Sequence, residues 1–181
     1  WGMKSNARLG REDWIAGAMK LLAQGGAAAV RVEPLAARLK VTKGSFYWHF
    51  RDLADLQEAM RQAWAERSTD WVIERVNDSG GDAAARLRKL LELAGVRLPS
   101  TEKAIRAWAA LDPATAKVVR AVDEKRSAFV RDLLSETGYS DVQAEALARV
   151  LTYYVVGELV SGLTPDARYN SAVADIICKP R

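Results

Sequence analysis

Apolar residues at helical spacing form three short groups near the start of the chain: Ile15, Ala18, Met19 and Leu22; then Val32, Leu35, Ala36 and Leu39; then Phe46 and Phe50. This spacing predicts three helices. Gly25-Gly26 ends the first, and Lys40-Val41 forms a turn between the second and the third. Pro34 fits the first turn of the second helix, and Thr42 fits the N-cap of the third. A helix, a short helix, a tight turn and another short helix outline a helix-turn-helix.

The rest of the chain also shows helical spacing, and no stretch alternates convincingly as a strand does. Glycine, proline and capping residues divide it into six expected helices, at 52–77, 82–98, 100–112, 113–137, 140–163 and 166–178. The fold class that we predict is therefore all-α, with an N-terminal three-helix helix-turn-helix and a C-terminal helical domain.

The segment from Val41 to Phe50 is short, aromatic and basic. In a helix, Phe46 and Phe50 share one face and would pack inward, whereas Lys43 and Tyr47 fall toward another. A DNA-recognition helix needs such inward anchors together with outward hydrogen-bond donors and a positive charge. An ordinary amphipathic core helix is the alternative interpretation.

Charge is distributed unevenly along the chain. Residues 1–52 hold nine Lys or Arg against four Asp or Glu, a net of +5, whereas residues 53–181 hold 18 against 19, a net of −1. A basic first third on a near-neutral body is typical of a nucleic-acid-binding module. Chance clustering is the alternative, but the basic residues coincide with the predicted helix-turn-helix.

Residues Arg11 to about Ala65 resemble the DNA-binding domain of the tetracycline-repressor (TetR) family of bacterial regulators. The resemblance depends on Arg11–Gly26, on Leu35–Phe50 with its string Lys-Gly-Ser-Phe-Tyr-Trp-His-Phe, and on the helix start at Asp52–Leu56. It implies a DNA-binding domain at 1–52, extending into a connecting helix to about 65. It also implies a helical effector-binding and dimerisation domain at 53–181.

The resemblance implies DNA contacts for eight residues. Lys43 and Tyr47 would bind backbone phosphate, and His49 would touch it at the helix end. Gly44 would allow close approach to the duplex. The family usually places Thr or Ser where this chain has Arg31, which cannot cap a helix but can reach phosphate. The candidates for base contacts in the major groove are Thr42, Ser45 and Trp48.

The helix expected at 140–163 is apolar nearly all round. One face holds Leu147, Leu151, Tyr154, Val155 and Leu159. Such a helix has to be covered on both sides, either by a second copy of the chain or as a buried central helix. The family resemblance favours a homodimer, because relatives build a four-helix interface from their last two long helices. We therefore expect these five residues at the dimer interface.

The C-terminal part is rich in aromatic residues that could line an effector site, and it holds arginines that could bind an anion. The alternative is plain core packing. The candidates for contacts with the effector are Trp64, Arg67, Trp71, Trp108, Arg126, Phe129 and Tyr153.

Catalytic and cofactor chemistry finds little support in the sequence. His49 is the sole histidine, no glycine-rich phosphate loop occurs, and the single cysteine, Cys178, cannot form a disulfide within the chain. We therefore expect no enzyme, no cofactor and no metal. No apolar run reaches the length of about 18 residues that a membrane span needs, and no signal peptide precedes Met3, so we expect a cytoplasmic protein.

These observations predict a ligand-responsive transcriptional regulator. We expect a homodimeric repressor that a small hydrophobic or aromatic effector releases from a palindromic operator in double-stranded DNA. Two alternatives stay open, namely a helical carrier or enzyme for a hydrophobic ligand and a partner-binding adaptor. The sequence names neither the operator, the effector nor the regulated genes, nor whether binding represses or activates.

Overall fold

The computed structural model describes residues 9–94, 99–161 and 167–178. Within these ranges the chain is helical and contains no strand, as the sequence predicts. The chain divides into two compact units, one ending at Ala63 and the other beginning at Trp64.

The first unit contains α1 (Arg11–Gly25), the 3₁₀ turn η1 (Ala27–Ala29), α2 (Val32–Leu39), α3 (Lys43–Phe46) and most of α4 (Leu53–Ala65). Helix α1 ends because Gly26 adopts a φ of 70° and its N–H returns to Leu22 O. Helix α1 packs on α2, and α2 packs on α3. The largest side chains buried between these helices are Trp14, Leu22, Leu35, Phe46, Leu56 and Met60.

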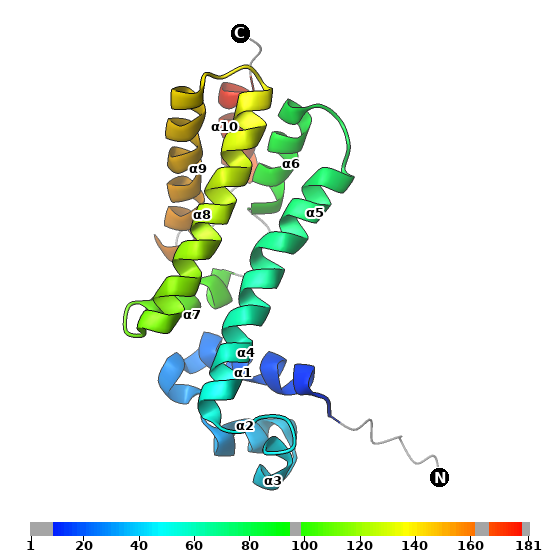
Figure 1. Ribbon diagram of the computed structural model, residues 1–181, viewed down its shortest axis with the longest axis vertical. Coiled ribbons are helices and arrows are strands. Elements are labelled where there is room, and N and C mark those ends of the chain that lie inside the picture. The colour runs from blue at the N-terminus through cyan, green and yellow to red at the C-terminus, as the bar shows by residue number, and fades with distance from the viewer. Residues whose placement is uncertain (1–8, 95–98, 162–166, 179–181) are drawn as a thin grey trace, which may run out of the picture. The chain divides into compact units, whose positions relative to one another are not determined.

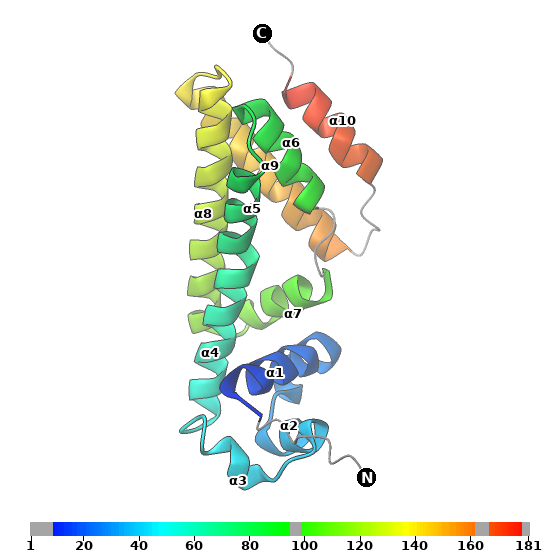
Figure 2. The same ribbon diagram turned by 90° about the vertical axis from the view of Figure 1, so that its right-hand side faces the viewer.

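The second unit continues from α4 through the π-helical turn η2 (Glu66–Asp70) into α5 (Trp71–Asp78). It then forms α6 (Ala83–Ala94), α7 (Pro99–Ala109), α8 (Pro113–Glu136), α9 (Asp141–Ser161) and α10 (Ala167–Ile177). Helices α8 and α9 pack side by side, α7 packs on α8, and α6 contacts α5, α8 and α10 (Figures 1 and 2).

The apolar core of the second unit lies among α5, α6, α8, α9 and α10. It contains Val76, Leu87, Leu91, Val130, Leu133, Leu134, Ala144, Ala148, Leu151 and Ile177. Burial of such side chains stabilises the fold by about 25 cal/mol per Å² of apolar surface.

The predicted helices are all present, with two differences. Helix α3 ends at Phe46, and residues 47–49 form a turn whose His49 and Phe50 N–H groups bond to Phe46 O. The expected long helix at 52–77 carries the π-turn, which apolar spacing did not reveal. Parts of three expected helices, at 95–98, 162–163 and 166, lie outside the described residues.

Candidate nucleic-acid interface and effector site

The turn between α2 and α3 is compact. Lys40 adopts the left-handed conformation (φ 58°, ψ 40°), its N–H bonds to Ala37 O, and the Val41 N–H bonds to Ala36 O at 3.0 Å. Left-handed backbone is costly for any residue with a Cβ, and glycine is the usual choice at this position of a helix end. The chain therefore makes a tight helix-turn-helix corner at the expense of strain at Lys40.

Aromatic side chains anchor the segment that follows. Phe46 and Phe50 are buried and stack at 5.4 Å, and Trp14 of α1 meets Phe46 edge-on at 5.5 Å. These anchors leave Tyr47 and Trp48 pointing outward, with exposed fractions of 55% and 84%. The expected division into inward anchors and outward donors is present, but Tyr47 and Trp48 lie in the turn that follows α3 and not in the helix itself.

Lys43 pairs with a carboxylate across the corner. Its Nζ donates to Oε1 of Glu33 in the first turn of α2, and both side chains are largely exposed. The hydrogen bond and charge of Glu33 raise the pKa of Lys43, and Lys43 in turn lowers the pKa of Glu33. Lys43 therefore stays charged over the physiological range, and a phosphate would have to compete with Glu33 for it.

The other predicted DNA contacts lie on or beside the same corner. Arg31 is the exposed N-cap residue of α2 and makes no side-chain cap, and Thr42 occupies the N-cap of α3 without a side-chain cap. A Cβ at Gly44 would meet only Thr42 Oγ1, at 3.8 Å, so the packing of this chain does not require glycine there. Ser45 and His49 are half-buried.

The predicted effector residues separate into two groups. Trp64 and Trp108 are buried, and Arg126 and Phe129 are half-buried. The exposed members are Arg67, Trp71 and Tyr153. All seven belong to the second unit, where the first four are buried or half-buried and the other three are exposed.

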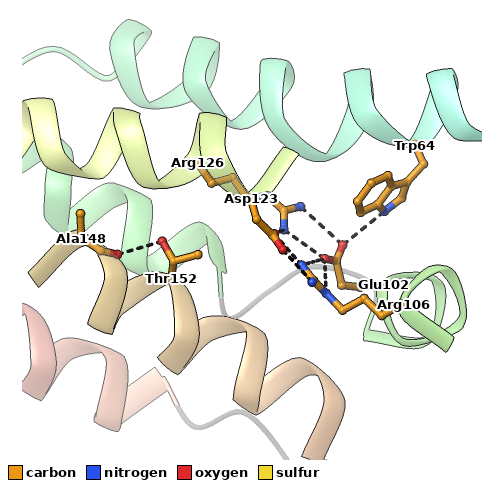
Figure 3. A network of polar contacts seen from close by, with 7 residues as sticks. All are labelled: Trp64, Glu102, Arg106, Asp123, Arg126, Ala148 and Thr152. Carbon is orange, nitrogen blue, oxygen red and sulfur yellow. Dashed lines mark hydrogen bonds and ion pairs between the residues drawn. The ribbon is translucent and has the colours of Figure 1, made fainter. Parts of the chain in front are cut away.

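A buried ionic network occupies the part of the second unit around Glu102 (Figure 3). Glu102 Oε1 accepts from Arg106 Nη2 at 2.8 Å and from Arg126 Nη1 at 3.0 Å, and its Oε2 accepts from Trp64 Nε1 at 3.2 Å. Arg106 also donates to both oxygens of Asp123, at 2.8 and 2.7 Å. Sequence spacing gave no sign of this cluster, because its members come from α4, α7 and α8.

Electrostatics in the network favour the ionised carboxylate. Burial by itself would raise the pKa of Glu102, but the charges and hydrogen bonds of Arg126 and Arg106 outweigh it and lower that pKa. Hydrogen bonds to Asp123 and the charge of Glu102 raise the pKa of Arg106 against the opposing effect of burial. Two guanidinium groups therefore face two carboxylates.

The predicted dimer residues whose side chains the structure describes are buried or half-buried within their own unit. Leu151 is 3% exposed, and Leu147, Tyr154 and Val155 are half-buried. The Tyr154 hydroxyl lies 3.0 Å from each of its two hydrogen-bond acceptors, Glu158 Oε1 and Asn170 Oδ1, which share its one proton. Burial together with Glu158 raises the pKa of Tyr154 to about 12. The side chain of Leu159 lies outside the described part of the chain.

The opposite face of α9 is apolar and exposed. We call it the α9 outer stripe, and Val142 (81% exposed) and Tyr153 (65%) are its most exposed members. The stripe consists of Val142, Ala146, Val150, Tyr153 and Val160.

Within residues 9–94, 99–161 and 167–178, no three His, Cys, Asp or Glu side chains gather as a metal site would require. No helix in these ranges is both long enough and apolar enough to span a bilayer.

Comparison with known families identifies the N-terminal part. Residues 15–60 match the family model described as bacterial regulatory proteins, tetR family. This range contains the helix-turn-helix with Phe46 and Phe50, and the match confirms the resemblance drawn from the sequence. No curated protein sequence matches the chain significantly.

Solved structures of similar fold cover nearly the whole chain. A transcriptional regulator from Rhodococcus sp. RHA1 is 20% identical, with a TM-score of 0.73 and coverage of 94% of both chains. A TetR-family regulator from Streptomyces coelicolor is 21% identical (TM-score 0.74, 93% of this chain and 91% of that one). A fatty acid degradation regulator from Bacillus halodurans is 15% identical (TM-score 0.73, 97% of both). At these identities the likeness establishes the fold.

Proposed function

We propose that this chain, which carries the DNA-binding domain of the TetR family within the fold of that family's regulators, is a ligand-responsive transcriptional regulator that binds duplex DNA. The supporting observation is that the segment matching the family coincides with an exposed corner of cationic and aromatic side chains. The regulators of this family are not enzymes, and a carrier or enzyme without DNA specificity remains the second candidate.

In this proposal the helix-turn-helix corner reads a major groove. Lys43, Tyr47, Arg31 and His49 bind phosphates, and the most exposed aromatic ring, Trp48, covers base edges or thymine methyl groups. Gly44 gives the backbone room to approach the duplex. Thr42 and Ser45 complete the set of base contacts.

Two copies of the chain bind together in this proposal. Leu151 is buried in its own core and Leu147, Tyr154 and Val155 are half-buried, so we assign the contact to the more exposed α9 outer stripe. A two-fold dimer buries this stripe against its copy. Each chain of this dimer then offers its helix-turn-helix to one half of a palindromic operator.

Effector binding would act by favouring a shape of the second unit in which the dimer no longer fits the operator. The effector must therefore bind one of the two shapes more tightly than the other. A shift of their populations from 1:99 to 99:1 requires a difference of about 5.5 kcal/mol in binding free energy. We propose that the protein represses transcription while it is bound to the operator. Effector binding then releases the protein from the DNA and allows transcription.

Selection of bound fragments from genomic DNA tests the function. The purified protein should enrich a small set of fragments that share a palindrome, and mobility shift at about 0.1 M salt should show preference for them over random duplex. A protein that retains no fragment above the background of random duplex, even at low salt, would instead favour the carrier or enzyme.

A further inference from the structure

The π-helical turn η2 changes which side chains face the interior of the second unit. Counting from buried Trp64, an uninterrupted α-helix would place Trp71 and Arg75 on the same face, at i+7 and i+11. One extra residue in the turn moves the register. Trp71 is 42% exposed and Arg75 is exposed, whereas Thr69 and Val76 are buried, at 2% and 0%. The turn therefore brings the Thr69 hydroxyl inward.

Thr69 Oγ1 has no hydrogen-bond partner among the described residues. The hydroxyl groups of Thr115 and Thr152 are each bonded, to Asp112 Oδ2 at 2.5 Å and to Ala148 O at 2.8 Å. The one other buried polar side-chain atom without a partner in the described ranges is Trp14 Nε1, in the first unit. A buried hydroxyl without a partner is costly, and π-turns are frequent at functional sites.

The charged groups near this turn are already balanced. Trp64, which shares the helix face of Thr69, donates to Glu102, and the Arg126 guanidinium lies 5.8 Å from the centre of its ring. Next to Thr69 in sequence, Asp70 pairs with Lys125 of α8. The Glu102 network holds two guanidinium groups and two carboxylates. A ligand with a net charge would leave one charge of this set unpaired, which is expensive away from water.

We propose that the effector is an uncharged molecule whose hydroxyl, carbonyl or ester group hydrogen-bonds to Thr69 Oγ1. Its apolar part packs against Trp64 on the same helix face. This inference depends on the proposed effector-responsive function and specifies the chemistry of the ligand. It also replaces the anion-binding role that the sequence suggested for Arg67 and Arg126, because Arg126 is engaged with Glu102 and Asp123 and Arg67 is exposed.

The first test needs no ligand. Thr69→Val replaces the hydroxyl by a methyl of similar size, so it should raise the Tm of the free protein by about 2–4 °C, since it removes an unpaired buried group. The matched control Thr115→Val removes a hydroxyl that is buried and bonded, and it should lower the Tm. A lower Tm for Thr69→Val would show that the hydroxyl is bonded in the free protein and would overturn the proposal.

The second test measures ligand charge directly. Two sets of matched probes are titrated by calorimetry: 4-phenyl-1-butanol with 4-phenylbutanoate and 4-phenylbutylamine, and 1-octanol with octanoate and octylamine. In at least one set the alcohol should bind at least tenfold more tightly than both charged members, and Thr69→Val should weaken its binding at least fivefold, with Thr115→Val unchanged.

Three outcomes contradict the proposal: a charged member that binds as tightly as the alcohol, an alcohol affinity that Thr69→Val leaves unchanged, or no binding in either set. The wild-type protein is assayed for selection of genomic fragments in parallel. If it still selects a palindrome, the effector chemistry is wrong and the regulator function stands. If it selects none, the function itself fails.

Discussion

At the scale of single residues, the helix-turn-helix corner depends on a few side chains with separate tasks. Phe46 and Phe50 hold the turn in place, which leaves Trp48 exposed, and Lys43 supplies a cation that Glu33 partly neutralises. The tasks of the exposed members, Lys43 and Trp48, can be removed by single substitutions without unfolding the unit, because these side chains contribute little to the core.

Lys43→Ala should weaken binding to all duplex sequences alike and reduce the slope of log affinity against log salt by about one unit, since one phosphate contact is lost. The slope is measured by fluorescence anisotropy from about 50 to 200 mM salt. Glu33→Gln is the matched control, because it frees Lys43 and should keep the slope while tightening binding. A Lys43→Ala slope equal to that of the wild type would remove Lys43 from the phosphate contacts.

Lys40→Gly should stabilise the first unit by about 0.5–1 kcal/mol, because it relieves left-handed strain at a non-glycine residue. Urea unfolding gives the free energy. The control, Lys20→Gly in the middle of α1, should destabilise by about 1 kcal/mol. If both variants lose the same free energy of unfolding, the left-handed backbone at Lys40 carries no strain.

At the scale of helices, register decides what each side chain does. Helix α9 turns Ala144, Ala148 and Leu151 into the core and the α9 outer stripe toward solvent. The π-turn likewise sends Trp71 out and Thr69 in. Helix α7 contributes Glu102 and Arg106 to the network, i and i+4 on one face.

Tyr153→Glu should convert the proposed dimer into monomers, because it places a charge in the middle of the α9 outer stripe. Light scattering reads the mass. Leu111→Glu is the control, since Leu111 is 87% exposed between α7 and α8 and lies outside the stripe. A Tyr153→Glu protein that keeps the mass of two chains would move the interface to another surface.

Glu102→Gln should destabilise the second unit by about 2–3 kcal/mol at pH 7, since it leaves two guanidinium groups with less compensation. The folded pKa of Glu102 lies below its unfolded value, so its contribution is complete above the unfolded pKa and is lost as the pH falls through the folded one. The difference in free energy of unfolding between wild type and Glu102→Gln, measured with urea, should therefore become smaller below about pH 4.5. A gap that stays constant to pH 3 would contradict the ionised, paired state.

At the scale of the whole molecule, the proposed regulator needs two chains for one operator. One helix-turn-helix domain makes few contacts with DNA by itself. The affinity of the protein for a duplex with a single half-site should therefore be much lower than its affinity for the palindrome. Scrambling one half-site should weaken binding at least 100-fold in a mobility shift, whereas moving both half-sites together within a longer duplex should change nothing. Equal affinity for one half-site and for two would argue against a dimeric reader.

The sequence alone determined the helical class, the order of the helices and the helix-turn-helix with its two phenylalanine anchors, because these depend on spacing within a few residues. It also carried the family resemblance, through a string of eight residues. Tertiary structure alone decided that Leu151 serves its own core, that Trp71 and Tyr153 face outward, and that Glu102 joins Trp64, Arg106 and Arg126. The reason is physical: one extra residue in a helix shifts every later side chain by about 100°, and contacts between residues 38 positions apart leave no trace in local periodicity.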